Sequence, residues 1–198
     1  AYLHPAGEGR LIGVGQDASS DGQVRGTQVS LFDVSDPAAP RRMASYQLSG
    51  ASSEAEFDPH AFLYWPNDQT IVVPVQGPYP VNQVAPDGDY VGSGTALVLR
   101  VNGAKIDEIG MLAHQANRVD KSQPSDGFID ASIRRAVVIG SSLWTVSAAG
   151  VLVSDLQTLD GQRWIPFPQV LPKGGGAPPQ PAPMPWPTPE PLPIDPPN

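Results

Sequence analysis

The chain has 198 residues, enough for one domain with a substantial core. Only 16% of the residues are charged and the net charge is −8, so the clustered Lys and Arg that nucleic-acid binding requires are missing. There is no cysteine, which excludes disulfides and thiol catalysis, and no apolar run approaches the ~20 residues of a membrane-spanning helix. The sequence therefore predicts no nucleic-acid partner and no transmembrane segment.

The first predicted unit, residues 1–50, contains short apolar and aromatic runs joined by turn residues, which are typical of β-hairpins. Its strands are expected at residues 2–5, 10–15, 28–34 and 42–48. A long loop over residues 16–26 is expected between the second and third strands. Asp17 and Asp21 flank two serines in this loop, which leaves a Ca²⁺ site open, although the spacing matches no known calcium loop.

Acidic residues and a histidine alternate in the connector that leads into the second unit. Glu54, Glu56, Asp58 and His60 would share one face of an extended strand. Glu54, Asp58 and His60 are weak candidates for a metal site, because carboxylates and imidazole bind Zn²⁺, Mn²⁺ or Ca²⁺. Strand neighbours at i and i+2 lie about 6.5–7 Å apart, too far for tight chelation. A structural role is favoured, in which Asp58 and His60 form hydrogen bonds across two units.

The second predicted unit, residues 56–113, repeats the pattern of the first. Its strands are expected at residues 62–66, 70–75, 96–101 and 106–112. The loop between its second and third strands, residues 76–94, is longer still and rich in Gly and Pro. Tyr79 and Tyr90 in this loop are candidate contacts for a partner. The Asp-Gly-Asp stretch at residues 87–89 is a second place where Ca²⁺ binding stays open.

The third predicted unit, residues 132–168, has tight turns and strands at residues 135–139, 143–146, 151–156 and 162–167. Antiparallel four-stranded units repeated at roughly 40–60 residues are typical of β-propeller blades. The predicted fold is all-β, a partial β-propeller of about three blades, since closed propellers need about four to eight. No nucleophile motif or dinucleotide fingerprint stands out, so the sequence predicts no catalytic residue and no cofactor.

Residues 169–198 form a Pro-rich tail in which every second residue from 179 to 193 is proline. Proline fixes its own φ and pushes the preceding residue toward an extended conformation, so we expect an extended tail. Met184 and Trp186 are apolar residues between the prolines, and they are candidate contacts with a partner surface. A solvated linker or stalk is the alternative for this segment.

Three segments of the sequence resemble the sequence pattern of a known family. They are LIGVGQD at residues 11–17, SLFDVSDP at residues 30–37, and SEA at residues 53–55 followed by HAFLY at residues 60–64. Over about residues 1–165 the chain is similar to secreted bacterial and archaeal proteins with a C-terminal β-propeller distantly related to WD repeats. The family pattern has a histidine directly after the aspartate, whereas Pro59 follows Asp58 here. The resemblance implies a secreted or membrane-attached protein, and N-terminal blades beyond those in this sequence.

Two functions follow from these expectations. The first is a non-catalytic, secreted or cell-surface scaffold whose second-to-third-strand loops bind a protein or glycan partner. The alternative is a fragment of an extracellular enzyme whose site is completed by missing blades. Three blades leave a sheet face uncovered at each end, so we expect a partner there. That partner is the N-terminal part of a cleaved precursor, which a start inside a strand without Met favours, or copies of the chain.

Overall fold

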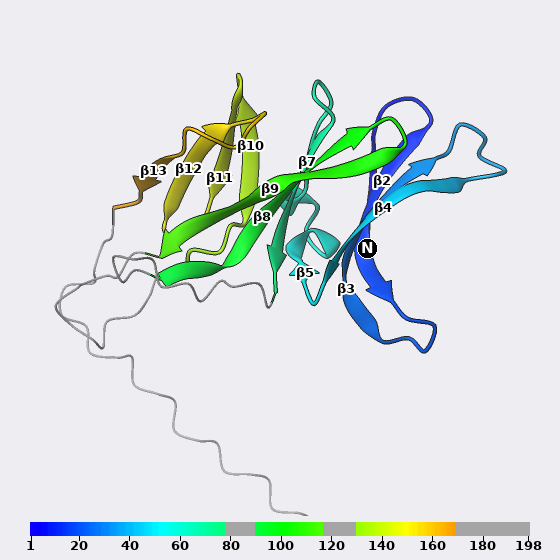
Figure 1. The fold of residues 1–198 in the computed structure, drawn as a ribbon, viewed down its shortest axis with the longest axis horizontal. Coiled ribbons are helices and arrows are strands. Elements are labelled where there is room, and N and C mark those ends of the chain that lie inside the picture. Colours follow the sequence, from blue (N-terminus) through cyan, green and yellow to red (C-terminus); the bar gives the residue numbers. More distant parts are fainter. Residues whose placement is uncertain (78–89, 117–129, 169–198) are drawn as a thin grey trace, which may run out of the picture.

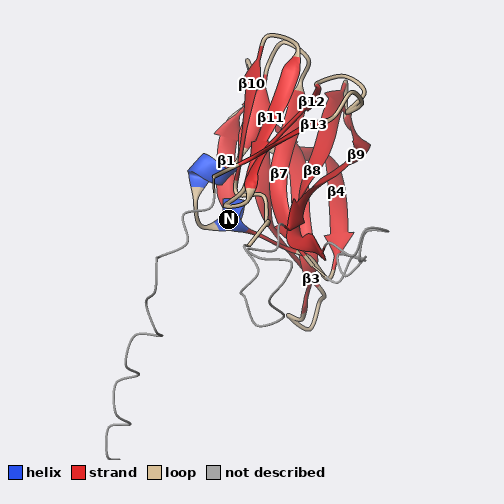
Figure 2. Cartoon of the chain, turned by 90° about the vertical axis from the view of Figure 1, so that its left-hand side faces the viewer, coloured by secondary structure: helices blue, strands red, loops and turns tan. Residues whose placement is uncertain are grey.

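A computed structural model describes residues 1–77, 90–116 and 130–168 of the chain (Figure 1). Within these residues the fold is all-β, as predicted, and consists of three antiparallel sheets that follow one another along the sequence. In Figure 2 the sheets lie one behind another, as the blades of a propeller do. No helix of the described part is long and apolar enough to cross a membrane.

Blade one pairs its four strands in chain order. Its strands are β1 (Tyr2–Pro5), β2 (Arg10–Ala18), β3 (Val24–Asp33) and β4 (Arg41–Ser49). The predicted long loop over residues 16–26 is wrong, because β2 and β3 continue their pairing almost to the tip, with a bulge at Asp17/Ala18. The Ser19 amide donates to the Gln23 carbonyl at 2.9 Å, and the Gln23 amide donates to the Ser19 hydroxyl at 3.1 Å. Blade one therefore projects a hairpin with a tight turn.

Blade two has five strands, β5 (Ser52–Ser53), β6 (Leu63–Trp65), β7 (Thr70–Gln76), β8 (Tyr90–Asn102) and β9 (Lys105–Ala116). β6 pairs with the start of β7 and β5 pairs with its end, so the two short strands together take the place of the single inner strand that the sequence predicted. β8 begins at Tyr90, so the last part of the predicted loop over residues 76–94 is strand. Residues 78–89 lie outside the described part of the chain.

The connector between β5 and β6 forms two 3₁₀ helices, η1 (Glu54–Glu56) and η2 (Pro59–Ala61), so the extended conformation predicted for this stretch is wrong. Two caps explain the turns. Ser53 and Glu56 form a capping box around η1, and the Asp58 carboxylate accepts a hydrogen bond from the His60 amide at the start of η2. The caps turn the backbone at each acidic position, and the alternation on one strand face is lost.

Blade three has strands β10 (Arg135–Ile139), β11 (Ser142–Val146), β12 (Gly150–Asp155) and β13 (Arg163–Pro166). Each begins and ends within one residue of its predicted bounds, since tight turns and β-branched runs mark them clearly. The Pro-rich tail, and the conformation predicted for it, lies outside the described residues.

Two apolar clusters hold the three blades together. The first lies between blades one and two and includes Ile12, Val14, Val29, Leu31, Ile71, Val73, Leu97 and Leu99. The second lies between blades two and three and includes Val72, Val98, Leu112, Leu143 and Leu152. Side-chain alternation along β7 lets one strand serve both clusters, because Ile71 and Val73 face blade one while Val72 faces blade three. All three side chains are fully buried.

Candidate functional site

Two arginines at the start of blade three hold the acidic connector of blade two. Arg134 Nη1 lies 2.9 Å from Glu54 Oε2. Arg135 reaches both acids, with Nη2 at 2.6 Å from Asp58 Oδ2 and Nη1 at 3.4 Å from Glu54 Oε1. His60 Nδ1 is 3.1 Å from Asp58 Oδ1, and the His60 side chain is 87% exposed. We call Glu54, Asp58, His60, Arg134 and Arg135 the junction cluster.

The carboxylates of the junction cluster are fully hydrogen-bonded within it. All four carboxylate oxygens of Glu54 and Asp58 accept at least one hydrogen bond. The pKa of Asp58 is lowered, mainly because the His60 backbone amide donates to it, with smaller contributions from the His60 ring and the positive charge of Arg135. Asp58 accepts a hydrogen bond across the blades from Arg135, whereas the His60 ring contacts Asp58 of its own blade.

The weak metal candidates Glu54, Asp58 and His60 do come together in this cluster, but Arg135 bridges the two carboxylates. In the ranges that the structure describes, no three His, Asp or Glu side chains form a group that could hold a metal ion. A guanidinium bound to both acids places a positive charge where a cation would lie. The expectation from the sequence, that these three residues do not bind a metal together, stays a prediction.

Asp21 and Tyr90, also singled out from the sequence, belong to elements that contribute no residue to the junction cluster. In the tight turn of blade one, the Ser19 hydroxyl donates to the Asp21 carboxylate, which lowers the pKa of Asp21. Tyr90 is the first residue of β8 and pairs with Ala116 of β9. Asp17 lies in β2 and pairs with Gly26 of β3. Five candidates lie outside the described residues: Tyr79, Asp87, Asp89, Met184 and Trp186.

Four rings pack where the inner strands of blades one and two meet. Tyr2 and His4 of β1 contact Phe62, with ring centroids 5.5 and 5.1 Å apart. His4 also contacts Tyr64 of β6 at 5.9 Å, and its Nδ1 lies 3.0 Å from the Tyr2 hydroxyl. Burial lowers the pKa of His4, which favours the neutral ring. These contacts fix the position of Tyr64 beside the junction of the two blades.

A polar groove of about 380 Å³ opens beside Tyr64. Its walls are the β1–β2 turn and the β6–β7 turn, which lie along the upper edge of Figure 1. The groove is lined by Ala6, Gly7, Glu8, Arg10, Tyr64, Pro66 and Gln69. Burial raises the pKa of Tyr64, and the positive charge of Arg10 opposes part of this shift. The sequence did not reveal the groove, because its long Gly- and Pro-rich stretches lie between the second and third strands, at the other end of the hairpins.

A buried histidine joins blades two and three. His114 of β9 lies 2.8 Å from the Thr145 hydroxyl through Nε2 and 2.8 Å from the Ser147 hydroxyl through Nδ1, and its ring packs on Trp164. An imidazole beside a serine hydroxyl is the arrangement that activates a nucleophile. Here His114 and Ser147 are only 1% and 4% exposed, which bars a substrate. Burial also lowers the pKa of His114 to about 4.

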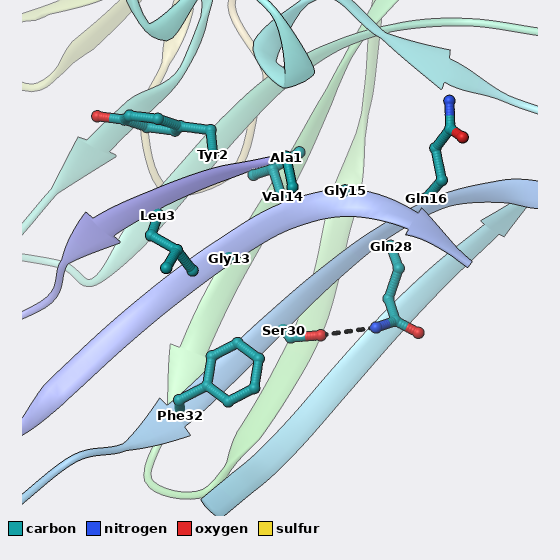
Figure 3. Close-up of a pocket in the computed structure, with 10 residues that line it drawn as sticks. All are labelled: Ala1, Tyr2, Leu3, Gly13, Val14, Gly15, Gln16, Gln28, Ser30 and Phe32. Atoms are coloured by element: carbon teal, nitrogen blue, oxygen red, sulfur yellow. Dashed lines mark hydrogen bonds between the residues drawn. The ribbon is translucent and has the colours of Figure 1, made fainter. Parts of the chain in front are cut away.

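The outward face of blade one carries a shallow hollow of about 150 Å³ (Figure 3). Gly13 and Gly15 of β2 line it, and the side chains of Leu3 and Phe32 lie over Gly13, where an added Cβ would come within 3.1 and 3.0 Å of them. Around them lie Leu3, Gln28, Ser30 and Phe32, with the Gln28 amide donating to the Ser30 hydroxyl at 2.8 Å. The hollow is on the opposite side of the sheet from blade two.

Comparisons with known proteins agree with this architecture. A family model described as "Beta propeller domain" matches residues 1–159, which include blades one and two and most of blade three. In an alignment of 180 positions that covers 88% of the chain, the sequence is 28% identical to a protein of Methanocaldococcus jannaschii named "Uncharacterized protein MJ1554". The match covers 22% of that relative, so the chain spans about a fifth of the relative's length.

Proposed function

The chain belongs to the beta propeller domain family, and from this premise we propose that it is a non-catalytic, secreted or cell-surface scaffold that presents a binding surface to a glycan or protein partner. The extracellular placement rests on the sequence resemblance described above. The observation that carries the binding function is the polar groove between blades one and two. Rigid blades that position short turns are a common platform for ligand binding.

The chemistry of the groove suits a ligand rich in hydroxyl groups. Arg10 supplies only donors, Glu8 supplies only acceptors, and the Gln69 amide and the Tyr64 hydroxyl supply both. A sugar hydroxyl donates and accepts at once, so this mixture can satisfy several hydroxyls on one ring. The hairpins hold these groups in place before a ligand arrives, which lowers the entropy lost on binding. We therefore favour a glycan over a protein as the occupant of the groove.

The alternative function, a fragment of an extracellular enzyme, requires reactive groups that a substrate can reach. His114 and Ser147 form an imidazole–hydroxyl pair, but both are buried. The carboxylates of Glu54 and Asp58 are bound by arginines. These groups serve the blade junctions, which supports the scaffold function.

The test is binding of the chain to a glycan microarray. We expect Arg10→Ala and Tyr64→Phe each to reduce the apparent affinity for the bound glycans by about tenfold or more, the loss of one to two hydrogen bonds. Tyr64→Phe keeps the ring that packs on His4, so the fold is preserved. Arg41→Ala is the matched control, because Arg41 is an exposed arginine paired with Asp33, outside the groove.

Two outcomes contradict this function. The first is a wild-type chain that binds no glycan on the array. The second is glycan binding that Arg10→Ala and Tyr64→Phe leave unchanged, which would place the ligand elsewhere on the blades.

A further inference from the structure

Arg10 brings a positive charge into the groove from the blade one side. It alternates with Ile12 and Val14 along β2, and both of those side chains are buried between blades one and two, so Arg10 points toward blade two. Tyr64 approaches from the opposite side, since its cross-strand partner Ile71 packs toward blade one. The charge of Arg10 opposes part of the rise in the pKa of Tyr64, so the guanidinium lies near the Tyr64 hydroxyl.

The Arg10 guanidinium has no counter-ion in the part of the chain that the structure describes. No carboxylate oxygen there lies within 4.0 Å of its nitrogens. Glu8, two residues before it, is exposed and does not pair with it. Asp33 is opposite Arg10 on β3, but its Oδ1 accepts hydrogen bonds from the Ser35 amide at 3.0 Å and the Ser35 hydroxyl at 2.6 Å. These bonds hold Asp33 in the β3–β4 turn, and Asp33 does not line the groove.

A half-buried guanidinium without a counter-ion favours an anionic ligand. A charge that is partly removed from water is disfavoured until an opposite charge or hydrogen bonds compensate it. The groove gives such a ligand room, because its volume of about 380 Å³ is within the range of roughly 300–1,000 Å³ typical of small-molecule sites. Arg10 therefore indicates a negatively charged group on the occupant.

Glu8 limits how much negative charge the groove accepts. Its carboxylate is on the same turn as Arg10 and would repel a second anionic group on the ligand. It accepts hydrogen bonds from neutral hydroxyls, and the Tyr64 hydroxyl and the Gln69 amide can both donate and accept. The groove thus suits one carboxylate that is flanked by hydroxyl groups better than it suits a densely sulfated or phosphorylated polymer.

We propose that the ligand of the groove is a glycan with a uronic acid unit, whose carboxylate pairs with Arg10 while its ring hydroxyls bind Glu8, Tyr64 and Gln69. The inference rests on the proposed function and names the class of glycan that the groove binds. The arginine fork matches a planar carboxylate through two parallel hydrogen bonds. The net charge of −8 gives the chain no general attraction for polyanions, so recognition depends on this single pair.

Carboxyl reduction of the ligand tests the proposal, because it converts the carboxylate into a neutral hydroxymethyl group and keeps the rest of each sugar. The probes are oligosaccharides of galacturonate, glucuronate and mannuronate, each beside its reduced counterpart, with binding measured by titration calorimetry. We expect the wild-type chain to bind at least one acidic oligosaccharide about tenfold or more tightly than its reduced form, because the charged pair is lost on reduction.

Variants of the groove assign this preference to Arg10. Arg10→Gln keeps a hydrogen-bond donor without the charge, so it should abolish the preference for the acidic form, and Arg10→Lys should retain part of it. Tyr64→Phe should weaken the binding of acidic and reduced forms by similar factors and leave the preference intact. Arg42→Gln is the matched control, since Arg42 is an exposed arginine of β4 that does not line the groove. Circular dichroism verifies that each variant is folded.

Three results would overturn the proposal and leave glycan binding in place. They are equal binding of every acidic oligosaccharide and its reduced form, binding of neutral glycans alone, and a preference for the acidic form that persists in Arg10→Gln. Competition by polyglutamate as strong as that of the acidic oligosaccharide would also overturn it, because the groove would then recognise charge without a sugar. A chain that binds no glycan, acidic or neutral, contradicts the proposed function itself, so the two failures are distinguishable.

Discussion

His114 and Arg135 tie blade three to blade two by different means. His114 is buried and neutral and forms hydrogen bonds to two hydroxyls of blade three. Arg135 is partly exposed and bridges two carboxylates of blade two. The first contact depends on the exclusion of water and the second on opposite charge, so the two should respond differently to pH and to substitution.

The buried imidazole of His114 predicts a loss of stability in mild acid. Its pKa falls from 6.5 to about 4 in the folded chain. The unfolded chain therefore takes up a proton near pH 6.5 that the folded chain does not bind until about pH 4. The stabilisation is complete above pH 6.5 and is lost as the pH falls to about 4, by roughly 3 kcal/mol. Urea unfolding across this range should show the loss in the wild-type chain.

His114→Gln is the control for this prediction, because it keeps a hydrogen-bonding side chain without a titrating ring. The carboxylates titrate in both proteins, so the difference between the two pH profiles belongs to His114. Parallel profiles between pH 6.5 and 4 would contradict the prediction.

Arg135→Ala should lower the free energy of unfolding by about 1 kcal/mol, because it removes the shared partner of Glu54 and Asp58 from a partly exposed site. Arg135→Lys should retain only part of this stabilisation, because a single ammonium group cannot reproduce the planar, forked hydrogen bonding of a guanidinium. Arg41→Ala is the matched control. Arg41 pairs with Asp33 at 2.8 Å but its side chain is 77% exposed, so its loss should change stability by less than about 0.5 kcal/mol. Equal effects of Arg135→Ala and Arg41→Ala in urea titrations would show that the junction cluster adds no stability.

At the scale of single elements, the β2–β3–β4 sheet depends on a close backbone approach at Gly26. Gly26 pairs with Ser49 of β4, and its φ is +151°. A Cβ at this position would lie 2.1 Å from the Leu48 carbonyl oxygen and 2.8 Å from the Gly50 nitrogen. Both atoms belong to the backbone, so relief requires movement of β4.

Gly26→Ala should therefore cost about 3 kcal/mol or more of unfolding free energy. Gly22→Ala is the comparison, since Gly22 lies in the hairpin turn with φ +82° and nothing within 4 Å of an added Cβ. It should cost about 1 kcal/mol for the left-handed backbone alone. Thermal and urea unfolding of both variants measure the difference, and a Gly26→Ala chain as stable as Gly22→Ala would show that β4 shifts freely.

At the scale of the whole molecule, blade two belongs to both apolar clusters, which couples blade one to blade three. Ile12 is fully buried between blades one and two. The three tryptophans of the described residues belong to blades two and three: Trp65, Trp144 and Trp164. Ile12→Ala should lower the unfolding free energy by about 2–5 kcal/mol. If the blades unfold together, unfolding followed by tryptophan fluorescence should show the whole decrease in unfolding free energy. The fluorescence transition should also coincide with the transition measured by circular dichroism.

Val24→Ala is the control for this experiment, because Val24 is also in blade one but is 60% exposed. It should change stability by less than about 0.5 kcal/mol. Ile12→Ala could instead shift the unfolding transition measured by circular dichroism and leave the transition measured by fluorescence unchanged. That result would show that blade one unfolds separately.

The sequence alone determined the class of fold and the positions of most strands. Strands of blade three were predicted within one residue, because period-two alternation and turn residues are local properties that the chain carries in every unit. Prediction failed where local signals are weak. The end of the β2–β3 hairpin could not be predicted, because residues 16–26 are mostly polar and show no apolar alternation. Backbone pairing does not require apolar side chains, so the strands continue through them. The alternating acids of the connector also fit a strand face, so the sequence favoured a strand there. The two 3₁₀ turns form because Ser53 caps the first and Pro59 begins the second.

Only the tertiary structure decided which side chains meet across the blades. Arg135 and Glu54 are 81 residues apart, and His114 and Thr145 are 31 apart. No pattern within one blade specifies such pairs, because they depend on which faces of two complete sheets are in contact. The groove beside Tyr64 and the hollow at Gly13 arise for the same reason. Each is a space between side chains whose positions are fixed by the packing of whole sheets, and a glycine in a strand does not by itself reveal what lies around it.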